Sequence, residues 1–257
     1  MEQLILVEGL PGTGKTTTTQ NIFNYLSSKR EKVAALFEGD ERIPCDFHKI
    51  ACIPIDEFNS FRIQHSDIAD NLLTISARTK NYVYLRLDKC SDLISKTFRK
   101  WDMGDERNQQ VNLSHYIPCA LERLDYWVSL NIDNTDTLII DSGFLQNPIN
   151  ELLFRKASDD EVCLFIQGIV ERLMLLNPVC FYLKRESAEA AILFAKQARG
   201  SLWSSRVDAM TKELNCPNLF EHRFKLELIL LPLIPHVICS VIDDDWSDFN
   251  KVVEQIF

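Results

Sequence analysis

Near its start the chain reads Leu4-Ile5-Leu6-Val7-Glu8-Gly9-Leu10-Pro11-Gly12-Thr13-Gly14-Lys15-Thr16, an apolar run that leads into a glycine-rich loop. Residues 9–16 satisfy the pattern G-x-x-x-x-G-K-[ST], and the apolar spacing over 16–28 predicts a helix directly after them. A strand followed by such a loop and a helix is the context in which this pattern binds phosphates. The sequence therefore predicts a phosphate-binding loop over residues 9–16.

The chemistry of this loop predicts ATP and Mg²⁺ as cofactors. Glycines let the backbone curl so that its N–H groups point at phosphate oxygens, and the positive end of the following helix adds to their field. We expect Lys15 to reach the β and γ phosphates as a catalytic residue, and the Thr16 hydroxyl to ligate Mg²⁺. The predicted nucleotide-binding residues are Gly9, Leu10, Pro11, Gly12, Thr13, Gly14, Lys15, Thr16 and Thr17.

Four later apolar runs predict further strands, at 32–37, 136–141, 179–183 and 236–241, with helical patterns between them. Five such strands predict an α/β class with the P-loop NTPase fold, in which helices flank a five-stranded, mostly parallel sheet. Asp141 ends one of these runs, so we expect it to be a second Mg²⁺ ligand, directly or through water. The alternative is a strand-end aspartate that caps the turn at Ser142 and Gly143.

The distance between the second and third strands is too long for an ordinary crossover, which indicates an insertion over 43–135 within a single domain of residues 1–257. Residues 53–62 and 113–130 have helical patterns, and 74–87 alternates like a hairpin with its turn at Lys80-Asn81. We interpret the insertion as a substrate-side subdomain. The alternative is that the insertion only packs against the rest of the domain.

The chain resembles the P-loop kinases that phosphorylate nucleotides and other small molecules. Val7-Glu8-Gly9 is similar to the loop entry of thymidylate kinases, and Phe37-Glu38-Gly39-Asp40-Glu41-Arg42 resembles the Gly-Asp segment of adenylylsulfate and gluconate kinases. The resemblance implies a carboxylate that orients the acceptor hydroxyl and takes its proton late in the transfer. Asp40 is the predicted catalytic acid and Glu38 the alternative, while Asp40 as an ordinary turn residue is a third interpretation.

A further resemblance to the same kinases covers Phe181 to Gly200, which is similar to their strand and lid-entry helix. It implies a lid-like helical region over 185–215, with Arg199 as a catalytic cation and Arg185 and Arg206 as helpers that neutralise the transferred phosphoryl group. A solvated helix face is the alternative for each arginine. His222 and Arg223 fall on a helical pattern, for which a structural role is favoured over substrate contact.

The composition and the sequence pattern argue against nucleic acids and membranes as partners. A net charge of −9 and a pI near 5.1 argue against a nucleic-acid polymer, because binding to its phosphates needs a cationic face. The apolar stretch 226–242 is interrupted by Glu227, two prolines and His236, so we expect a buried helix and strand rather than a membrane span. The first residues lack the basic flank and cleavage site of a signal peptide. These features predict a cytoplasmic protein without a membrane partner.

The cysteines are predicted to be reduced structural thiols. Eight of them, at positions 45, 52, 90, 119, 163, 180, 216 and 239, include no C-x-x-C pair and lie mostly in apolar runs. Buried free cysteine behaves as a small hydrophobic residue. His48, His65 and His115 lack ligand-like spacing with cysteines or acids, so no zinc site is predicted.

The leading functional prediction is an ATP- and Mg²⁺-dependent phosphotransferase that acts on a small acceptor, either a nucleoside, a nucleotide or a sugar-like molecule. A GTPase would need an Asn-Lys-x-Asp segment, and residues 250–253 (Asn-Lys-Val-Val) lack the aspartate. A motor or transporter ATPase would carry a Leu-Ser-Gly-Gly-Gln signature and an acid after Asp141, where Ser142 stands. A P-loop ATPase or regulatory protein that binds nucleotide without transferring phosphate remains the alternative. The oligomeric state is left open.

Overall fold

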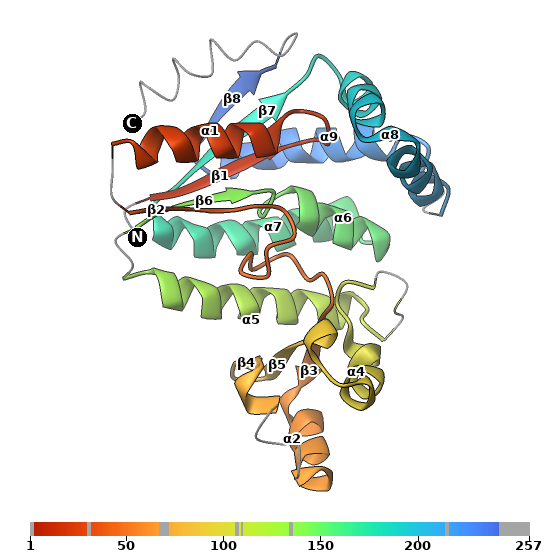
Figure 1. Ribbon diagram of the computed structural model, residues 1–257. Helices are drawn as coiled ribbons and strands as arrows, with labels where there is room; N and C mark the ends of the chain where they lie inside the picture. The colour runs from red at the N-terminus through yellow and green to blue at the C-terminus, as the bar shows by residue number, and fades with distance from the viewer. Residues whose placement is uncertain are drawn as a thin grey trace.

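A computed structural model describes residues 3–29, 32–66, 72–105, 108, 110–133, 136–213 and 216–241, so that residues 250–253 lie outside it. Its centre is a five-stranded sheet in the order β2-β6-β1-β7-β8, and every neighbouring pair is parallel (Figure 1). The five strands are β1 (Gln3–Gly9), β2 (Val33–Leu36), β6 (Thr137–Asp141), β7 (Pro178–Lys184) and β8 (His236–Ser240). The predicted α/β class with a five-stranded sheet is confirmed.

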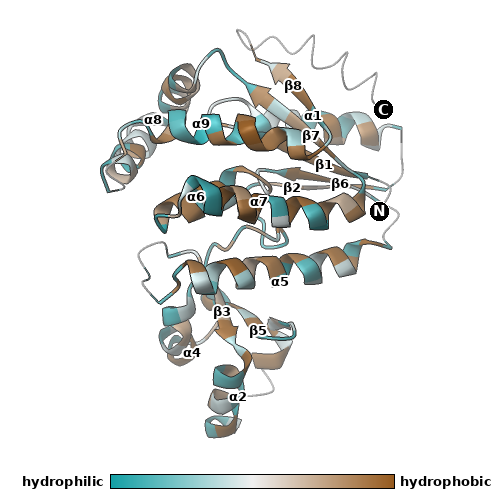
Figure 2. Ribbon diagram, turned by 180° about the vertical axis from the view of Figure 1, so that it is seen from behind, coloured by the Kyte–Doolittle hydropathy of each residue, from teal (hydrophilic) through white to brown (hydrophobic). Residues whose placement is uncertain are grey.

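Helices cover both faces of this sheet, which explains why its strands are nearly continuous apolar runs. On one face Ile5 and Val7 pack against Ile22 and Leu26 of α1 (Lys15–Ser27). On the other face Leu4 and Leu6 belong to a larger core that the remaining helices supply. These helices are α5 (Leu113–Asn131), α6 (Gln146–Phe154), α7 (Asp159–Leu173) and α9 (Leu219–Leu230). Figure 2 shows the central strands largely in the colour of hydrophobic residues.

The inserted region forms a second, antiparallel sheet with its own core. The sheet has the order β3-β5-β4, and its strands are β3 (Ile50–Pro54), β4 (Ser76–Arg78) and β5 (Tyr82–Arg86). Ala51, Val83 and Leu85 pack there against α2 (Ile55–Gln64) and α4 (Asp92–Phe98). Figure 1 shows α5 lying between this small sheet and helices α6 and α7. The predicted hairpin is confirmed.

One inserted strand was missed by the sequence analysis. Residues 53–62 were expected to be helical from Ile53, whereas β3 continues to Pro54 and α2 begins at Ile55. The reason is tertiary, because Ile50 to Pro54 pair with Arg86 to Tyr82 of β5. A short apolar run before a helical pattern does not reveal this pairing.

The region expected to resemble a lid is a helical segment, α8 (Ala188–Glu213). Gly200 interrupts it with φ 79° and ψ −175°, which are not helical values, so the segment consists of two helices joined at a kink. Figure 1 shows α8 beside the carboxyl ends of β1 and β7. Short 3-10 turns complete the described elements at Leu87–Lys89, Arg99–Trp101, Met174–Leu176 and Leu231–Leu233. Among the described residues, none of the helices has the length and apolar character needed to cross a membrane.

Candidate functional site

The two predicted Mg²⁺ ligands lie in direct contact. The parallel pairing of β1 with β6 places Asp141 opposite Val7, and the loop after β1 leads into α1 at Lys15. Thr16 Oγ1 donates a hydrogen bond to Asp141 Oδ2 at 2.7 Å, and Ser142 Oγ donates to Asp141 Oδ1 at 2.9 Å. Asp141 is fully buried, whereas Thr16 is exposed toward the open side of the loop. The sheet register therefore brings together a hydroxyl and a carboxylate separated widely in sequence.

Lys15 is buried inside the loop. Its Nζ donates to the carbonyl oxygen of Leu10 at 3.2 Å, and the hydroxyl of Thr13 donates to the same oxygen at 2.8 Å. Burial lowers the pKa of the Lys15 ammonium, and the positive charge of Arg223 lowers it further. An anion bound in the loop, such as a phosphate, would offset both effects on the pKa of Lys15.

The tip of the loop packs against α8. Gly12 has a φ of +85°, and a Cβ atom built on it would lie 2.2 Å from the carbonyl oxygen of Ala191. Only glycine combines that conformation with so close an approach. Arg185 Nε donates to the Gly12 carbonyl at 2.8 Å and its guanidinium lies over the ring of Phe194 at 3.9 Å. Arg185 thus contacts the backbone of the loop.

Glu8 holds the turn after Asp141 against β1. Its Oε1 accepts from the backbone N–H groups of Gly143 at 3.0 Å and Phe144 at 2.6 Å, and its Oε2 accepts from Gln146 at 3.2 Å. The side chain is completely buried, and this desolvation, with a smaller effect from the charge of Glu227, raises the pKa of Glu8 to about 7. From the sequence, Glu8 is notable only for its resemblance to the loop entry of thymidylate kinases, and this contact is not predicted.

The two acids considered for the acceptor side have different surroundings. The Asp40 carboxylate accepts from Arg42 Nε at 2.9 Å and Arg42 Nη2 at 2.6 Å, and these hydrogen bonds lower the pKa of Asp40. The Glu38 carboxylate accepts from Gln146 Nε2 at 2.9 Å. Asp40 is therefore already paired with a guanidinium of its own turn, whereas Glu38 is bound to an uncharged amide of α6.

Two cavities meet at Glu38 and Asn150. The first, of about 270 Å³, is bordered by Pro11 of the loop and by cationic and aromatic side chains. These are Arg199, Trp203 and Arg206 of α8, with Phe220 and Arg223 of α9. The second, of about 360 Å³, is lined chiefly by acids, amides and phenyl rings. Those are Asp46, Asn147, Glu151, Phe47 and Phe154. Arg199 and Arg206, which were named from the sequence, thus lie at the cavity next to the loop.

Arg223, for which the sequence favoured a structural role, forms a buried ion pair at the edge of the first cavity. Its side chain is 1% exposed, and Nε donates to Glu227 Oε1 at 2.6 Å. The other guanidinium nitrogens reach Asn150 Oδ1 at 3.2 Å, Gln146 Oε1 at 3.3 Å and the Gly9 carbonyl at 3.4 Å. One buried cation therefore connects the loop to Gln146, which holds Glu38. His222 points elsewhere and pairs with Asp159 at 2.8 Å.

No protein-family model and no curated protein matches the chain. The site consists of the glycine-rich loop, a hydroxyl–carboxylate pair and two adjoining cavities.

The prediction that all eight cysteines are reduced is wrong, while the absence of a zinc site stays a prediction. Cys52 and Cys119 are joined by a disulfide, while Cys45, Cys90, Cys163, Cys180, Cys216 and Cys239 are free. His115 lies beside this pair, with one ligand atom from each of the three residues within 4.8 Å of the others. The local signal was present, since His115 and Cys119 are one helical turn apart on α5. Cys52 comes from β3, and its proximity depends on the tertiary fold.

Proposed function

We propose that this chain is an ATP- and Mg²⁺-dependent phosphotransferase that moves the γ-phosphoryl group of ATP to a small-molecule acceptor. The observation that carries the proposal is the 2.7 Å hydrogen bond between Thr16 and Asp141 beside the buried Lys15. A hydroxyl and a carboxylate are hard oxygen donors, which fit Mg²⁺. Thr16 and Asp141 would hold the ion, which would supply positive charge against the phosphates.

The residues of the loop supply the donor half of the reaction. Backbone N–H groups of residues 9–16 and the ammonium of Lys15 would hold the phosphates in place. Lys15 would exchange the Leu10 carbonyl for phosphate oxygens, which offset the desolvation of its charge. Arg199 and Arg206 border the cavity next to Pro11, so their guanidinium groups are suited to neutralise the phosphoryl group during transfer.

Glu38 is the acceptor-side acid that we favour. It stands where the arginine-lined cavity meets the acid-lined cavity, and its partner Gln146 is fixed through Arg223. From this position its carboxylate would accept a hydrogen bond from an acceptor hydroxyl and take the proton late in the transfer. Asp40, the first choice from the sequence, is occupied by Arg42.

The second cavity favours a class of acceptor. Asp46 and Glu38 give it negative charge, while Glu151 is paired with Arg155, and this charge disfavours an acceptor that carries its own phosphate. Phe47 and Phe154 offer flat apolar surfaces, and Asn147 and Asn150 offer amide donors and acceptors. These features support a neutral or cationic molecule with a ring and hydroxyl groups, such as a nucleoside or an amino sugar.

The proposal is tested by incubating the protein with γ-labelled ATP, Mg²⁺ and separate pools of nucleosides, nucleotides, sugars and aminoglycoside-like acceptors. We expect a labelled product in the nucleoside or amino-sugar pool. Lys15→Ala should abolish it, whereas Lys96→Ala, an exposed lysine of α4, should leave it unchanged. Circular dichroism checks that both variants fold. ATP binding without transfer or acceptor-stimulated hydrolysis in any pool would instead support a nucleotide-binding regulatory protein.

A further inference from the structure

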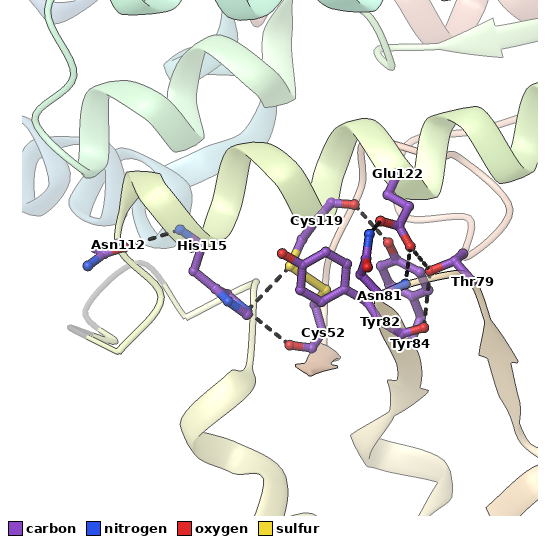
Figure 3. The surroundings of a disulfide bond; sticks show 9 residues. All are labelled: Cys52, Thr79, Asn81, Tyr82, Tyr84, Asn112, His115, Cys119 and Glu122. Carbon is purple, nitrogen blue, oxygen red and sulfur yellow. Dashed lines mark hydrogen bonds between the residues drawn. A yellow bond between two sulfur atoms is a disulfide. The ribbon is translucent and has the colours of Figure 1, made fainter. Parts of the chain in front are cut away.

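The joint between the inserted sheet and α5 holds three metal-binding side chains. Figure 3 shows Cys52, in the middle of β3, facing Cys119 and His115, which project from the same side of α5. His115 Nε2 lies 3.4 Å from Cys119 Sγ and 3.0 Å from the carbonyl oxygen of Cys52. In the described part of the chain, this is the single group of three or more histidine, cysteine or acidic side chains whose ligand atoms cluster so closely.

Contacts that do not involve sulfur hold the same joint together. Tyr84 of β5 donates its hydroxyl hydrogen to the Cys119 carbonyl at 2.8 Å. The Glu122 carboxylate of α5 accepts from the backbone N–H of Asn81 and from its Nδ2, both at 2.7 Å. These bonds, drawn in Figure 3, fix the small sheet on α5 independently of the disulfide. Reduction of the disulfide therefore leaves the two cysteines and His115 in one place.

We propose that the reduced chain binds one Zn²⁺ ion through the sulfur atoms of Cys52 and Cys119 and the imidazole of His115. Two thiolates and one histidine with an open fourth position form a known zinc ligand set, with Zn–S near ~2.3 Å and Zn–N near ~2.0 Å. In a tetrahedral arrangement such bonds place the ligand atoms roughly 3.5–3.8 Å apart. The distance of 3.4 Å between His115 Nε2 and Cys119 Sγ is close to that requirement.

The environment suits a soft cation with nitrogen and sulfur ligands. Cys52 and Cys119 are fully buried, so their thiolates need a positive partner, and a bound Zn²⁺ would supply it. Coordination of the ion by His115 Nε2 would replace the contact of that atom with the Cys52 carbonyl oxygen. The rings of Trp101 and Tyr82 flank the imidazole at centroid distances of 4.7 and 5.7 Å. His115 itself is half-buried, which leaves an approach for the ion and for a water as fourth ligand.

Zinc and the disulfide exclude one another at this joint. Binding to the reduced chain releases the two thiol protons to solvent and transfers no electrons. A small-molecule disulfide such as glutathione disulfide would reverse it: two thiol–disulfide exchanges form the Cys52–Cys119 bond, reduce the oxidant to two thiols that take up two protons, and free Zn²⁺. Whether the joint is metal-bound or cross-linked would then depend on the thiol–disulfide balance of the surroundings.

The first experiment needs no substitution. The full chain is reduced with a water-soluble phosphine, which becomes the phosphine oxide, and the reductant is removed without oxygen. Zinc is then titrated in competition with a chromophoric chelator. We expect one tightly bound ion per reduced chain and none in the disulfide form. Equal zinc binding by the two forms, or none by either, would overturn the proposal.

Variants identify the ligands. Cys52→Ser, Cys119→Ser and His115→Gln should each weaken zinc binding by more than about 100-fold. Loss of a residue that only hydrogen-bonds to a metal ligand already lowers metal affinity by about 10–100-fold. Cys163→Ser removes a free cysteine of α7 and should leave zinc affinity unchanged. With Co²⁺ in place of zinc, thiolate charge-transfer absorption should appear in the parent and in Cys163→Ser and decline in the two ligand cysteine variants. Unchanged zinc affinity in all three ligand variants would place the metal elsewhere.

Discussion

At the scale of single residues, Glu38 and Asp40 are separated by one glycine yet have different partners. The Asp40 carboxylate is held by the Arg42 guanidinium in an exposed turn. The Glu38 carboxylate is held by Gln146, and through it by the buried Arg223. A sequence pattern places both acids after the second strand, but it does not show which one faces a cavity. That difference arises from α6 and α9, which are distant in sequence.

Kinetics of two isosteric variants distinguish these acids. Glu38→Gln should lower kcat by about 100-fold or more, because it removes a proton acceptor while retaining the size of the side chain. Asp40→Asn should lower kcat by no more than about fivefold, because an exposed ion pair contributes little. KM for ATP should change little in either variant. A larger loss of kcat in Asp40→Asn would assign the acid to Asp40.

At the scale of elements, the glycine-rich loop of residues 9–16 packs against α8. The loop reaches α8 at Gly12, where a side chain would meet the Ala191 carbonyl at 2.2 Å. Arg185, in the segment that leads into α8, donates to the carbonyl of the same glycine. The position of α8 therefore constrains the backbone conformation of the loop.

Gly12→Ala should consequently weaken ATP binding by about tenfold or more and destabilise the fold by about 1–3 kcal/mol. Gly39→Ala is the matched control, because Gly39 also has a positive φ but no atom lies within 4 Å of its added Cβ. Fluorescent-nucleotide titration measures the affinity and urea unfolding measures the stability. Equal effects of the two variants would show that backbone strain alone, and not contact with α8, is responsible.

The sequence predicted the elements whose pattern is local. The central strands were placed within two residues at each end, since helices cover both faces and the strands read as apolar runs. β3 was missed, because its pairing with β5 overrides the helical pattern that begins inside it. Although their proposed roles stay predictions, the glycine-rich loop, Thr16 and Asp141 were recognisable from the local sequence. Gln146 and Arg223 were not, because their roles depend on side chains from other elements.

At the scale of the whole molecule, burial of Glu8 links the stability of the central sheet to pH. The ordinary pKa of 4.5 applies to the unfolded chain, and burial raises it to about 7 in the folded protein. The folded state therefore binds the proton more tightly. This contribution to stability is complete below pH 4.5, where Glu8 is protonated in both states, and it is lost as the pH rises through 7.

Urea unfolding as a function of pH checks this effect. Between pH 4.5 and 8 the parent protein should lose more stability than Glu8→Gln, by an amount on the order of 3 kcal/mol for a shift of this size. The glutamine variant has no carboxyl group at this position, so its stability should depend less on pH. Parallel curves for the two proteins would show that Glu8 titrates normally in the folded state.

The strand order of the central sheet also governs how the chain folds during synthesis. Among the described strands, β1 pairs with β6 and β7, and β2 pairs with β6, so no ladder of this sheet closes before Thr137 emerges from the ribosome. The antiparallel sheet, by contrast, is complete at Arg86, and its strands are near neighbours along the chain. Local pairings cost less loop-closure entropy and form faster. The nascent chain therefore completes the inserted sheet first, and β1 and β2 stay unpaired in the central sheet until β6 has been synthesised.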